Sequence, residues 1–170
     1  EWLRQPIEAR SDLVFFGPNG TGKTGLAVAL ARAAALQHQQ RSRFWTLREL
    51  AIAWRNTFRE GDRETDGPSE QEFLSLLISI PILILDEVSG QRLSTFVEDT
   101  LTLIVDKRQR EQRPTILTLN TPAESKDDAA VLADLLGPTL QDRLRERGQF
   151  WPMQGLSRRK TYSRSQEQAP

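Results

Sequence analysis

A glycine-rich segment close to the start of the chain, Gly17–Thr24, has the sequence GPNGTGKT. It matches every fixed position of the phosphate-binding loop G-x-x-x-x-G-K-[ST]. The apolar run Leu13–Phe16 precedes it and an Ala- and Leu-rich helical pattern follows, so strand, loop and helix come in the order that such a loop needs. A chance glycine-rich turn is the alternative, and this order disfavours it. We expect a phosphate-bearing ligand to bind where the helix begins.

The residue types of this loop have separate physical tasks. Glycines let the backbone curl so that successive N–H groups point at phosphate oxygens, and the helix N-terminus adds its dipole. Lys23 would contact the β- and γ-phosphates of a nucleotide, and the Thr24 hydroxyl would coordinate Mg²⁺. We predict nucleotide contacts along the loop and its successor, namely Gly17, Pro18, Asn19, Gly20, Thr21, Gly22, Lys23, Thr24 and Gly25.

A second apolar run, Ile82–Leu85, ends in two carboxylates, Asp86 and Glu87. We expect Asp86 to hold Mg²⁺, directly or through a water, and Glu87 to polarise the attacking water as a general base. The alternative is a strand that meets an acidic turn by chance. The adjacent pair favours hydrolysis over mere storage of a nucleotide.

The run Thr115–Leu119 ends in Asn120. A polar amide at the tip of a strand could orient the attacking water against the γ-phosphate. Asn before Thr-Pro is also a common turn, so the residue alone is a weak signal. Its place in the order of the strands is what favours a role in the site.

Short apolar runs alternate with helical patterns, which predicts a mostly parallel sheet covered on both faces and thus the α/β class. Strands are expected at Leu13–Phe16, Phe44–Thr46, Ile82–Leu85, Thr115–Leu119 and Phe150–Trp151. Helices are expected at Gly22–His38 and Gln91–Arg110, and after the capping-box pairs Thr46/Glu49 and Ser69/Glu72. The polar segment Glu60–Pro68 is predicted to be a mobile loop.

Composition excludes several classes of protein. The longest nearly unbroken apolar run, Leu76–Leu85, has about half the length that a bilayer span needs, so we expect no membrane protein. No basic start leads into an apolar stretch and a cleavage site, so we expect no signal peptide. The count of 0 cysteines excludes a disulfide scaffold, a zinc finger and a thiol nucleophile, and is compatible with the cytoplasm.

Charge is unevenly spread although the formal net charge is zero. From Arg143 to the end of the chain, seven Arg or Lys residues stand against two Glu residues. This basic stretch suggests an anionic partner, either nucleotide phosphate or nucleic acid, and the alternative is a solvated tail.

The ordered motifs, together with Leu136–Leu144, resemble those of AAA+ ATPases. More narrowly, the chain is similar to the DnaC-type bacterial replicative helicase loaders over about residues 13–159. This resemblance implies a P-loop NTPase fold, a three-layer sandwich with a five-stranded sheet and no separate C-terminal lid domain. It also implies ATP and Mg²⁺ as cofactors, and a strand order in which Asn120, as the sensor-1 residue, ends the strand between those of the P-loop and Asp86. The narrower match is carried by Asn56–Gly61, Leu85–Gln91, Ile104–Arg108 and Arg113–Thr115.

The resemblance implies roles for two arginines as well. Arg143 takes the place of the arginine finger, which contacts the γ-phosphate bound to a neighbouring copy and therefore requires a homo-oligomer. The alternative for Arg143 is a surface arginine paired with Asp142 or Glu146. Arg158 or Arg159 takes the place of the sensor-2 arginine, with Arg158 preferred.

By the same resemblance, residues 1–159 form the AAA+ ATPase domain of a DNA replication helicase loader, and residues 160–170 form a polar, flexible tail. The domain would bind and hydrolyse ATP where copies meet, grip single-stranded DNA, and load or release a DnaB-type replicative helicase in the cytoplasm. The helicase-binding N-terminal domain of such loaders is absent from residues 1–170. The alternatives are an IstB-type transposition helper ATPase, a nucleotide-switched adaptor with little turnover and, more weakly, a metabolic P-loop kinase.

Contacts to single-stranded DNA would combine a basic groove with aromatic side chains on which bases stack. The segment Leu47–Ser79 is long enough for the two extra helices that AAA+ initiators and loaders carry after the second strand. Phe58 and Phe96 fit the apolar stripes of their helices equally well, and zero net charge argues against tight, indiscriminate DNA binding. The candidate contacts are Arg55, Phe58, Arg59, Ser94 and Phe96.

Overall fold

The computed structural model describes residues 1–57, 68–88, 95–122, 127–155 and 157. Its sheet has five strands in the order β2-β3-β4-β1-β5, and every neighbouring pair is parallel. This confirms the α/β prediction and the predicted place of the Asn120 strand between the P-loop and Asp86 strands. The strands are β1 (Asp12–Gly17), β2 (Ser42–Thr46), β3 (Ile82–Asp86), β4 (Thr115–Asn120) and β5 (Gly148–Pro152).

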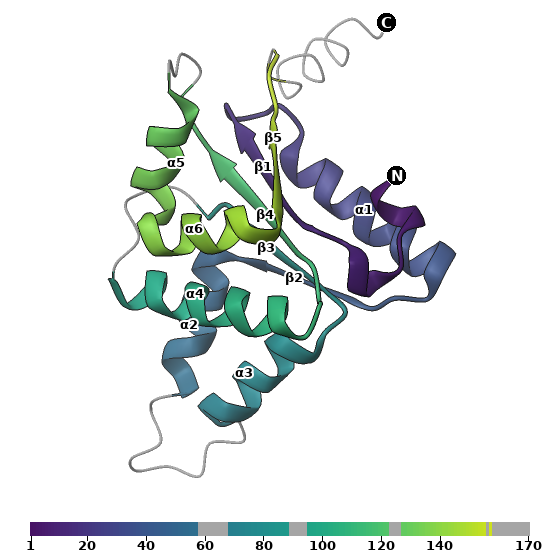
Figure 1. Cartoon of the computed structure of the whole chain (residues 1–170). Coiled ribbons are helices and arrows are strands. Elements are labelled where there is room, and N and C mark those ends of the chain that lie inside the picture. Colours follow the sequence, from purple (N-terminus) through teal and green to yellow (C-terminus); the bar gives the residue numbers. More distant parts are fainter. Residues whose placement is uncertain (58–67, 89–94, 123–126, 156, 158–170) are drawn as a thin grey trace, which may run out of the picture.

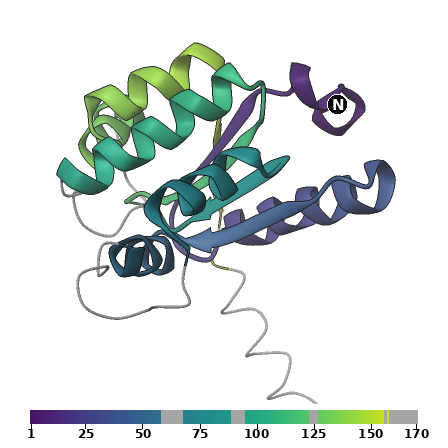
Figure 2. The same ribbon diagram turned by 90° about the horizontal axis from the view of Figure 1, so that it is seen from below.

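Helices cover both faces of the sheet, so the molecule has three layers (Figure 1 and Figure 2). They are α1 (Lys23–His38), α2 (Leu47–Thr57), α3 (Glu70–Ser79), α4 (Thr95–Arg110), α5 (Asp128–Leu136) and α6 (Pro138–Arg147). On one face α1 and two short N-terminal 3-10 turns, at Trp2–Arg4 and Ile7–Ala9, pack against alternate strand residues such as Phe15. On the other face α2 to α6 pack against the intervening residues, such as Phe16. The alternation follows from the pleat of the strands.

Helix α1 lies close to the sheet because its buried apolar positions are small. Ala27, Ala31 and Ala34 face the strands at a spacing that places them on one side of a helix. The helix begins directly after the P-loop, and its first residue, Lys23, is buried with them. The position of the loop is therefore tied to the packing of α1.

Hydrogen-bonded caps begin two helices where the sequence predicted them. The Ser69 amide donates to the Glu72 carboxylate at 2.9 Å, and the Ser69 hydroxyl accepts from the Glu72 amide at 3.3 Å. Thr46 and Glu49 exchange the same bonds, at 3.1 and 3.2 Å, ahead of α2. These bonds lower the pKa of both glutamates because they favour the charged carboxylate. Both capping boxes are confirmed.

The bounds of helices α5 and α6 were not predicted, although the sequence holds signals for their ends. Asp127 caps α5 by accepting a hydrogen bond from the Ala130 amide at 3.0 Å. Gly137, with φ +78°, separates the two helices, and α6 begins with Pro138. Capping aspartate, helix-ending glycine and N-terminal proline are recognisable in sequence.

Two predicted segments fall partly outside the described residues. Of the predicted loop Glu60–Pro68, only Pro68 is described. The helix predicted over Gln91–Arg110 is described from Thr95 onward, as α4. Within the described ranges, no helix is both long enough and apolar enough to cross a membrane.

Arg108 on α4 is completely buried. Its guanidinium forms hydrogen bonds at the edge of the sheet that lies opposite the P-loop. Its Nη1 donates to the carbonyl oxygens of Leu77 at 2.6 Å and Ile80 at 2.8 Å, at the end of α3. Its Nη2 donates to the carbonyl oxygen of Pro114 at 2.7 Å, and its Nε to Thr115 Oγ1 at 3.0 Å. Burial lowers the pKa of Arg108 to about 10. The guanidinium stays charged at neutral pH and joins α3 and α4 to the start of β4.

Replacing Arg108 with lysine should therefore destabilise the fold. A lysine keeps the charge but lacks the planar fork of donors, so several buried carbonyl groups lose their partner. We expect the free energy of unfolding to fall by about 3 kcal/mol. Arg110→Lys is the matched control: its side chain is 74% exposed and pairs with Asp106 at 2.8 Å, and such pairs contribute less than about 1 kcal/mol. Urea unfolding measures both, and equal losses would contradict the structural role of Arg108.

Candidate nucleotide-binding site

The residues between β1 and α1 form a loop at the carboxyl edge of the sheet (Figure 1). Strand β1 lies between β4 and β5, and its last residue, Gly17, pairs with Asn120 at the end of β4. The next strand, β3, ends at Asp86. Because parallel strands end at the same edge, the fold brings the P-loop, Asp86 and Asn120 together, as ligand sites of open α/β sheets require.

Two glycines of the loop occupy positions that exclude a side chain. Gly17 has φ +145°, and a Cβ there would lie 2.1 Å from the carbonyl oxygen of Met153, which follows β5. Gly20 has φ +83°, and a Cβ there would lie 2.1 Å from the Ser157 hydroxyl. The Met153 amide in turn donates to the Phe16 carbonyl oxygen at 2.7 Å. The segment after β5 therefore packs directly against the phosphate loop.

Lys23 is held inside the loop. Its side chain is buried, and its Nζ donates to the carbonyl oxygens of Gly17 at 2.8 Å and Pro18 at 2.7 Å. Thr21 Oγ1 donates to the same Pro18 carbonyl oxygen at 3.0 Å. The ammonium group thus already lies in the loop whose backbone amides are suited to phosphate oxygens.

Thr24 and Asp86 meet at the start of α1. The Thr24 hydroxyl donates to Asp86 Oδ1 at 2.8 Å, and Asp86 is buried whereas Thr24 is exposed. A hydroxyl that gives its proton to a carboxylate keeps its lone pairs for a cation, and both groups are the hard oxygen ligands that Mg²⁺ prefers. Among the described residues, no group of three or more His, Cys, Asp and Glu could hold a metal. The pair fits a Mg²⁺ ion that takes its other ligands from phosphates and water.

Glu87 follows Asp86 in a left-handed backbone conformation, with φ +54°. Its amide donates to Thr118 Oγ1 at 3.0 Å, and the Val88 amide donates to the Thr118 carbonyl oxygen at 2.9 Å. Thr118 Oγ1 itself donates to Asp86 Oδ1 at 2.5 Å. Thr118 is absent from the predicted site. In the sequence Thr118 is marked only by a hydroxyl between the apolar residues of β4, which does not indicate its partners.

Arg143, the predicted arginine finger, lies on α6. Its Nη1 contacts the Glu146 carboxylate at 3.0 Å, and its Nε lies 3.8 Å from Asp106 Oδ1 on α4. The side chain is 40% exposed. The pairing with Glu146, which was the alternative to the finger role, is present in the single chain. A role toward a neighbouring copy stays a prediction.

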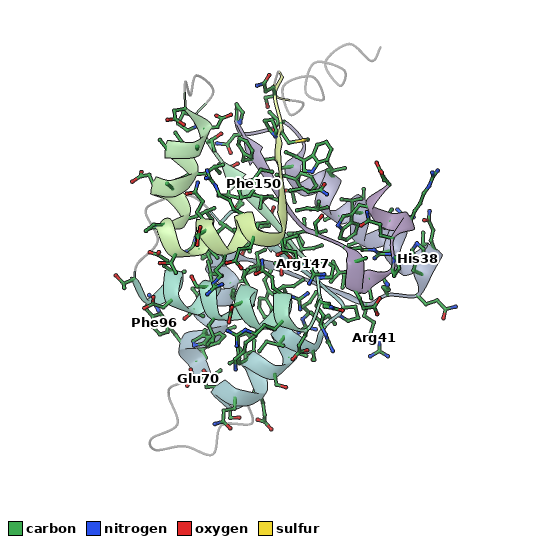
Figure 3. The ribbon with its side chains drawn as sticks, viewed as in Figure 1. His38, Arg41, Glu70, Phe96, Arg147 and Phe150 are labelled. Atoms are coloured by element: carbon green, nitrogen blue, oxygen red, sulfur yellow. The ribbon has the colours of Figure 1, made fainter. Side chains whose placement is uncertain are left out.

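The predicted DNA contacts and sensor-2 arginines are only partly described. Arg55 is exposed on α2. Phe96, labelled in Figure 3, lies at the start of α4. It is 48% exposed. Phe96 also lines a small apolar hollow between α2 and α4 with Leu47 and Trp54, so it lies at the rim of the core. Phe58, Arg59, Ser94, Arg158 and Arg159 lie outside the described residues.

An apolar cavity of about 410 Å³ opens next to the first turns of α1. It is lined by Leu26 and Leu30 of α1, Phe15 of β1, Trp151 of β5 and the N-terminal Trp2, among others. A planar, mostly apolar group such as a purine base fits a cavity of this size and lining. None of these residues was predicted to contact a ligand. Leu26 comes two positions after Thr24 of the P-loop, so the cavity and the loop are neighbours.

Comparison with known protein families gives a match that covers most of the chain. Residues 4–166 match the model described as "IstB-like ATP binding protein". The replicative helicase loader DnaC of Escherichia coli (strain K12) is 29% identical over 141 residues, which are 83% of this chain and 53% of that protein. The DnaC of Buchnera aphidicola subsp. Schizaphis graminum (strain Sg) is 28% identical over the same shares. The chain thus spans about half the length of these relatives.

Solved structures share the fold described above. The crystal structure of the DnaC helicase loader superposes with a TM-score of 0.77 at 25% identity, over 90% of this chain and 84% of that chain. AMPPCP-bound DnaA from Aquifex aeolicus gives a TM-score of 0.69 at 16% identity, over 96% of this chain and 48% of that chain. The second likeness concerns the fold alone. Together they confirm the predicted AAA+ type of P-loop fold.

Gly17→Ala should destabilise the loop, because the new methyl group would meet the Met153 carbonyl oxygen at 2.1 Å in a conformation, φ +145°, that disfavours a side chain. We expect the free energy of unfolding to fall by about 1–3 kcal/mol. Gly25→Ala is the matched control for stability, because a Cβ there meets nothing within 4 Å and alanine favours a helix over glycine by about 1 kcal/mol. Urea unfolding measures the free energy of unfolding of both variants. An unchanged free energy of unfolding in Gly17→Ala would contradict the close approach of Met153.

Proposed function

We infer the function from one premise: this chain belongs to the family of IstB-like ATP-binding proteins. We propose that residues 1–159 form the AAA+ ATPase domain of a replicative helicase loader. The observation that carries the ATPase activity is the Thr24–Asp86 hydrogen bond of 2.8 Å at the P-loop, with Glu87 next in the chain. The loader function is supported by the similarity to DnaC in sequence and in fold.

In the proposed reaction, water attacks the γ-phosphorus of ATP, the bond from that phosphorus to the β–γ bridging oxygen breaks, and ADP leaves. The Glu87 carboxylate accepts a proton from the attacking water, and the Asn120 side chain orients that water. Lys23 exchanges loop carbonyl oxygens for oxygens of the β- and γ-phosphates. Mg²⁺, held by Thr24 and Asp86, would neutralise the charge that builds up on the phosphates.

The base of ATP is proposed to enter the apolar cavity beside α1. Leu26 lines that cavity two residues after Thr24, which keeps the base within a nucleotide's length of the P-loop. Trp151 is 53% exposed at the cavity and offers an aromatic face for stacking. A sensor-2 contact from Arg158 remains part of the proposal.

Arg143 is proposed to act on the nucleotide of a neighbouring copy. Its guanidinium is partly exposed, and Glu146, its partner at 3.0 Å, is an exposed carboxylate. Asp106 is less exposed, but it lies farther away, at 3.8 Å. Exposed pairs of this kind are weak, so they can be exchanged for a phosphate at small cost. A guanidinium supplied in trans would make turnover depend on assembly into a homo-oligomer.

Single-stranded DNA and a DnaB-type helicase are the proposed partners, and the cytoplasm is the proposed location. The DnaC relatives are named replicative helicase loaders, and this chain resembles them over 83% of its length. Among the described residues, exposed Arg55 and half-exposed Phe96 offer a charge and an aromatic face for a strand. Phe58, Arg59 and Ser94 complete the proposed contacts.

Two other functions compete with this proposal. A transposition helper ATPase would use the same nucleotide site. It is the second candidate because the matching family is described as IstB-like. A nucleotide-switched adaptor would bind ATP and barely hydrolyse it. The position of Glu87 directly beside Asp86 speaks for hydrolysis.

ATP turnover with and without single-stranded DNA tests the ATPase activity. We expect DNA to stimulate the wild type and Lys23→Ala to lose nucleotide binding. Glu87→Gln should bind ATP but turn over about 10²–10⁴-fold more slowly, since it lacks the general base. Binding without turnover in the wild type would favour the adaptor.

A mixing experiment tests the trans role of Arg143. Arg143→Ala should turn over at least about 10³-fold more slowly than the wild type, and so should Lys23→Ala. A mixture of the two should regain activity, because Lys23→Ala chains supply the arginine and Arg143→Ala chains supply the intact P-loop. Arg145→Ala, exposed on the same helix, is the matched control and should behave as the wild type. No recovery in the mixture would contradict a finger in trans.

Co-purification distinguishes loader from transposition helper. The full-length protein should retain a DnaB-type helicase in the presence of ATP and release it after hydrolysis. The Glu87→Gln variant should retain it without release. Association with a transposase instead of a helicase would favour the second candidate.

A further inference from the structure

Thr118 bonds both to Asp86, which ends β3, and to Glu87, which follows that strand, although no sequence motif singles it out. It lies within β4, two residues before Asn120, and is 1% exposed. Its neighbours Leu117 and Leu119 face the core on one side of the sheet, whereas Thr118 pairs with Phe15 of β1 on the side of α1. A hydroxyl in such a place needs partners, because burial of an unpaired polar group is costly.

The Thr118 hydroxyl acts as donor to the last residue of β3 and as acceptor from the residue that follows it. Thr118 Oγ1 donates its proton to Asp86 Oδ1 at 2.5 Å. The same oxygen accepts the Glu87 amide at 3.0 Å. One atom therefore contacts the side chain of the first carboxylate residue and the backbone of the second.

The backbone of Thr118 adds a further bond. Its carbonyl oxygen accepts the Val88 amide at 2.9 Å, so two successive amides of the turn after β3 are anchored on one residue. Between them Glu87 has φ +54°, a conformation that costs a residue other than glycine about 1–2 kcal/mol. Such a conformation persists when the surrounding contacts hold it in place. Here the bonds of the Glu87 and Val88 amides to Thr118 do so.

We propose that Thr118 is a positioning residue for hydrolysis, which sets the Asp86 carboxylate and the direction of the Glu87 side chain at the same time. This rests on the proposed ATPase function. Asp86 also accepts from Thr24, so it keeps one hydroxyl partner without Thr118. The Glu87 amide loses its bond to the Thr118 hydroxyl, and the left-handed turn that aims the general base relaxes. Loss of the Thr118 hydroxyl should therefore lower turnover more than nucleotide binding.

Thr118→Val tests the hydroxyl with almost no change in shape. We expect kcat for ATP to fall about 10–100-fold, as for a misplacement of a catalytic group by about 1 Å, with KM changed less than about threefold. Thr118→Ser keeps the hydroxyl and should stay within about threefold of the wild type. Thr57→Val is the matched control, because Thr57 is also buried and its hydroxyl bonds to the Trp54 carbonyl oxygen at 2.7 Å, on α2.

Amide hydrogen exchange, followed by NMR in the nucleotide-free protein, gives a readout independent of activity. We expect the Glu87 amide to exchange about tenfold faster or more in Thr118→Val, and at the wild-type rate in Thr118→Ser and Thr57→Val. If Thr118→Val does not fold, Thr118→Ala removes the hydroxyl without adding volume and is judged by the same criteria.

The outcomes separate this inference from the ATPase proposal. A wild type that hydrolyses ATP and a Thr118→Val variant with the same kcat would overturn the positioning role and leave the ATPase proposal intact. A wild type without turnover would count against the ATPase proposal, and the Glu87 exchange rate would then decide alone whether Thr118 sets the turn. An unchanged exchange rate overturns the inference in either case.

Discussion

The Asp86 carboxylate joins three elements of the fold at a single atom. Strand β3 carries it, α1 donates to its Oδ1 through Thr24, and β4 donates to the same oxygen through Thr118. Asp86 is 5% exposed and Thr118 is buried, so the bond between them is shielded from water and stronger than an exposed one. The start of α1 and the ends of β3 and β4 are thereby fixed together. The P-loop ends where α1 begins, so its geometry depends on the same junction.

Charged groups without a catalytic task hold the opposite edge of the sheet. Arg108 binds carbonyl oxygens ahead of β4 and at the end of α3. Asp12, at the start of β1, accepts from the Thr115 amide at 2.6 Å and from Gln109 Nε2 at 2.8 Å. Burial raises the pKa of Asp12 and lowers that of Arg108, because it disfavours the charged form of each group. Their hydrogen bonds offset the cost of burying these polar groups. These bonds fix the amino edge of the sheet, whereas the residues of the proposed nucleotide site lie at the carboxyl edge.

Local patterns in the sequence predict those structural elements that depend on a few neighbouring residues. The P-loop, the capping boxes and the five apolar strands are of this kind, and the structure has these elements there. Thr118 could not be predicted, because its partners lie more than 30 positions away and only strand pairing brings them together. The cavity beside α1 is equally non-local, since β1, α1, β5 and the N-terminal turn each supply part of its lining. Arg143 required the family resemblance, because its partners within the chain indicate only a surface ion pair.

The helix that carries Arg143 and the loop proposed to bind phosphate are joined by one strand. Helix α6 leads directly into β5, and Met153, which follows β5, packs on Gly17. Strand β5 pairs with β1 along its length, so it cannot shift without disturbing the strand that ends in the P-loop. If Arg143 acts on the nucleotide of a neighbour, a displacement of α6 is passed to the chain's own P-loop through this short, hydrogen-bonded path. In such an assembly, turnover would then be coupled between neighbouring sites, because in each chain α6 is joined through β5 to the strand that ends in the P-loop.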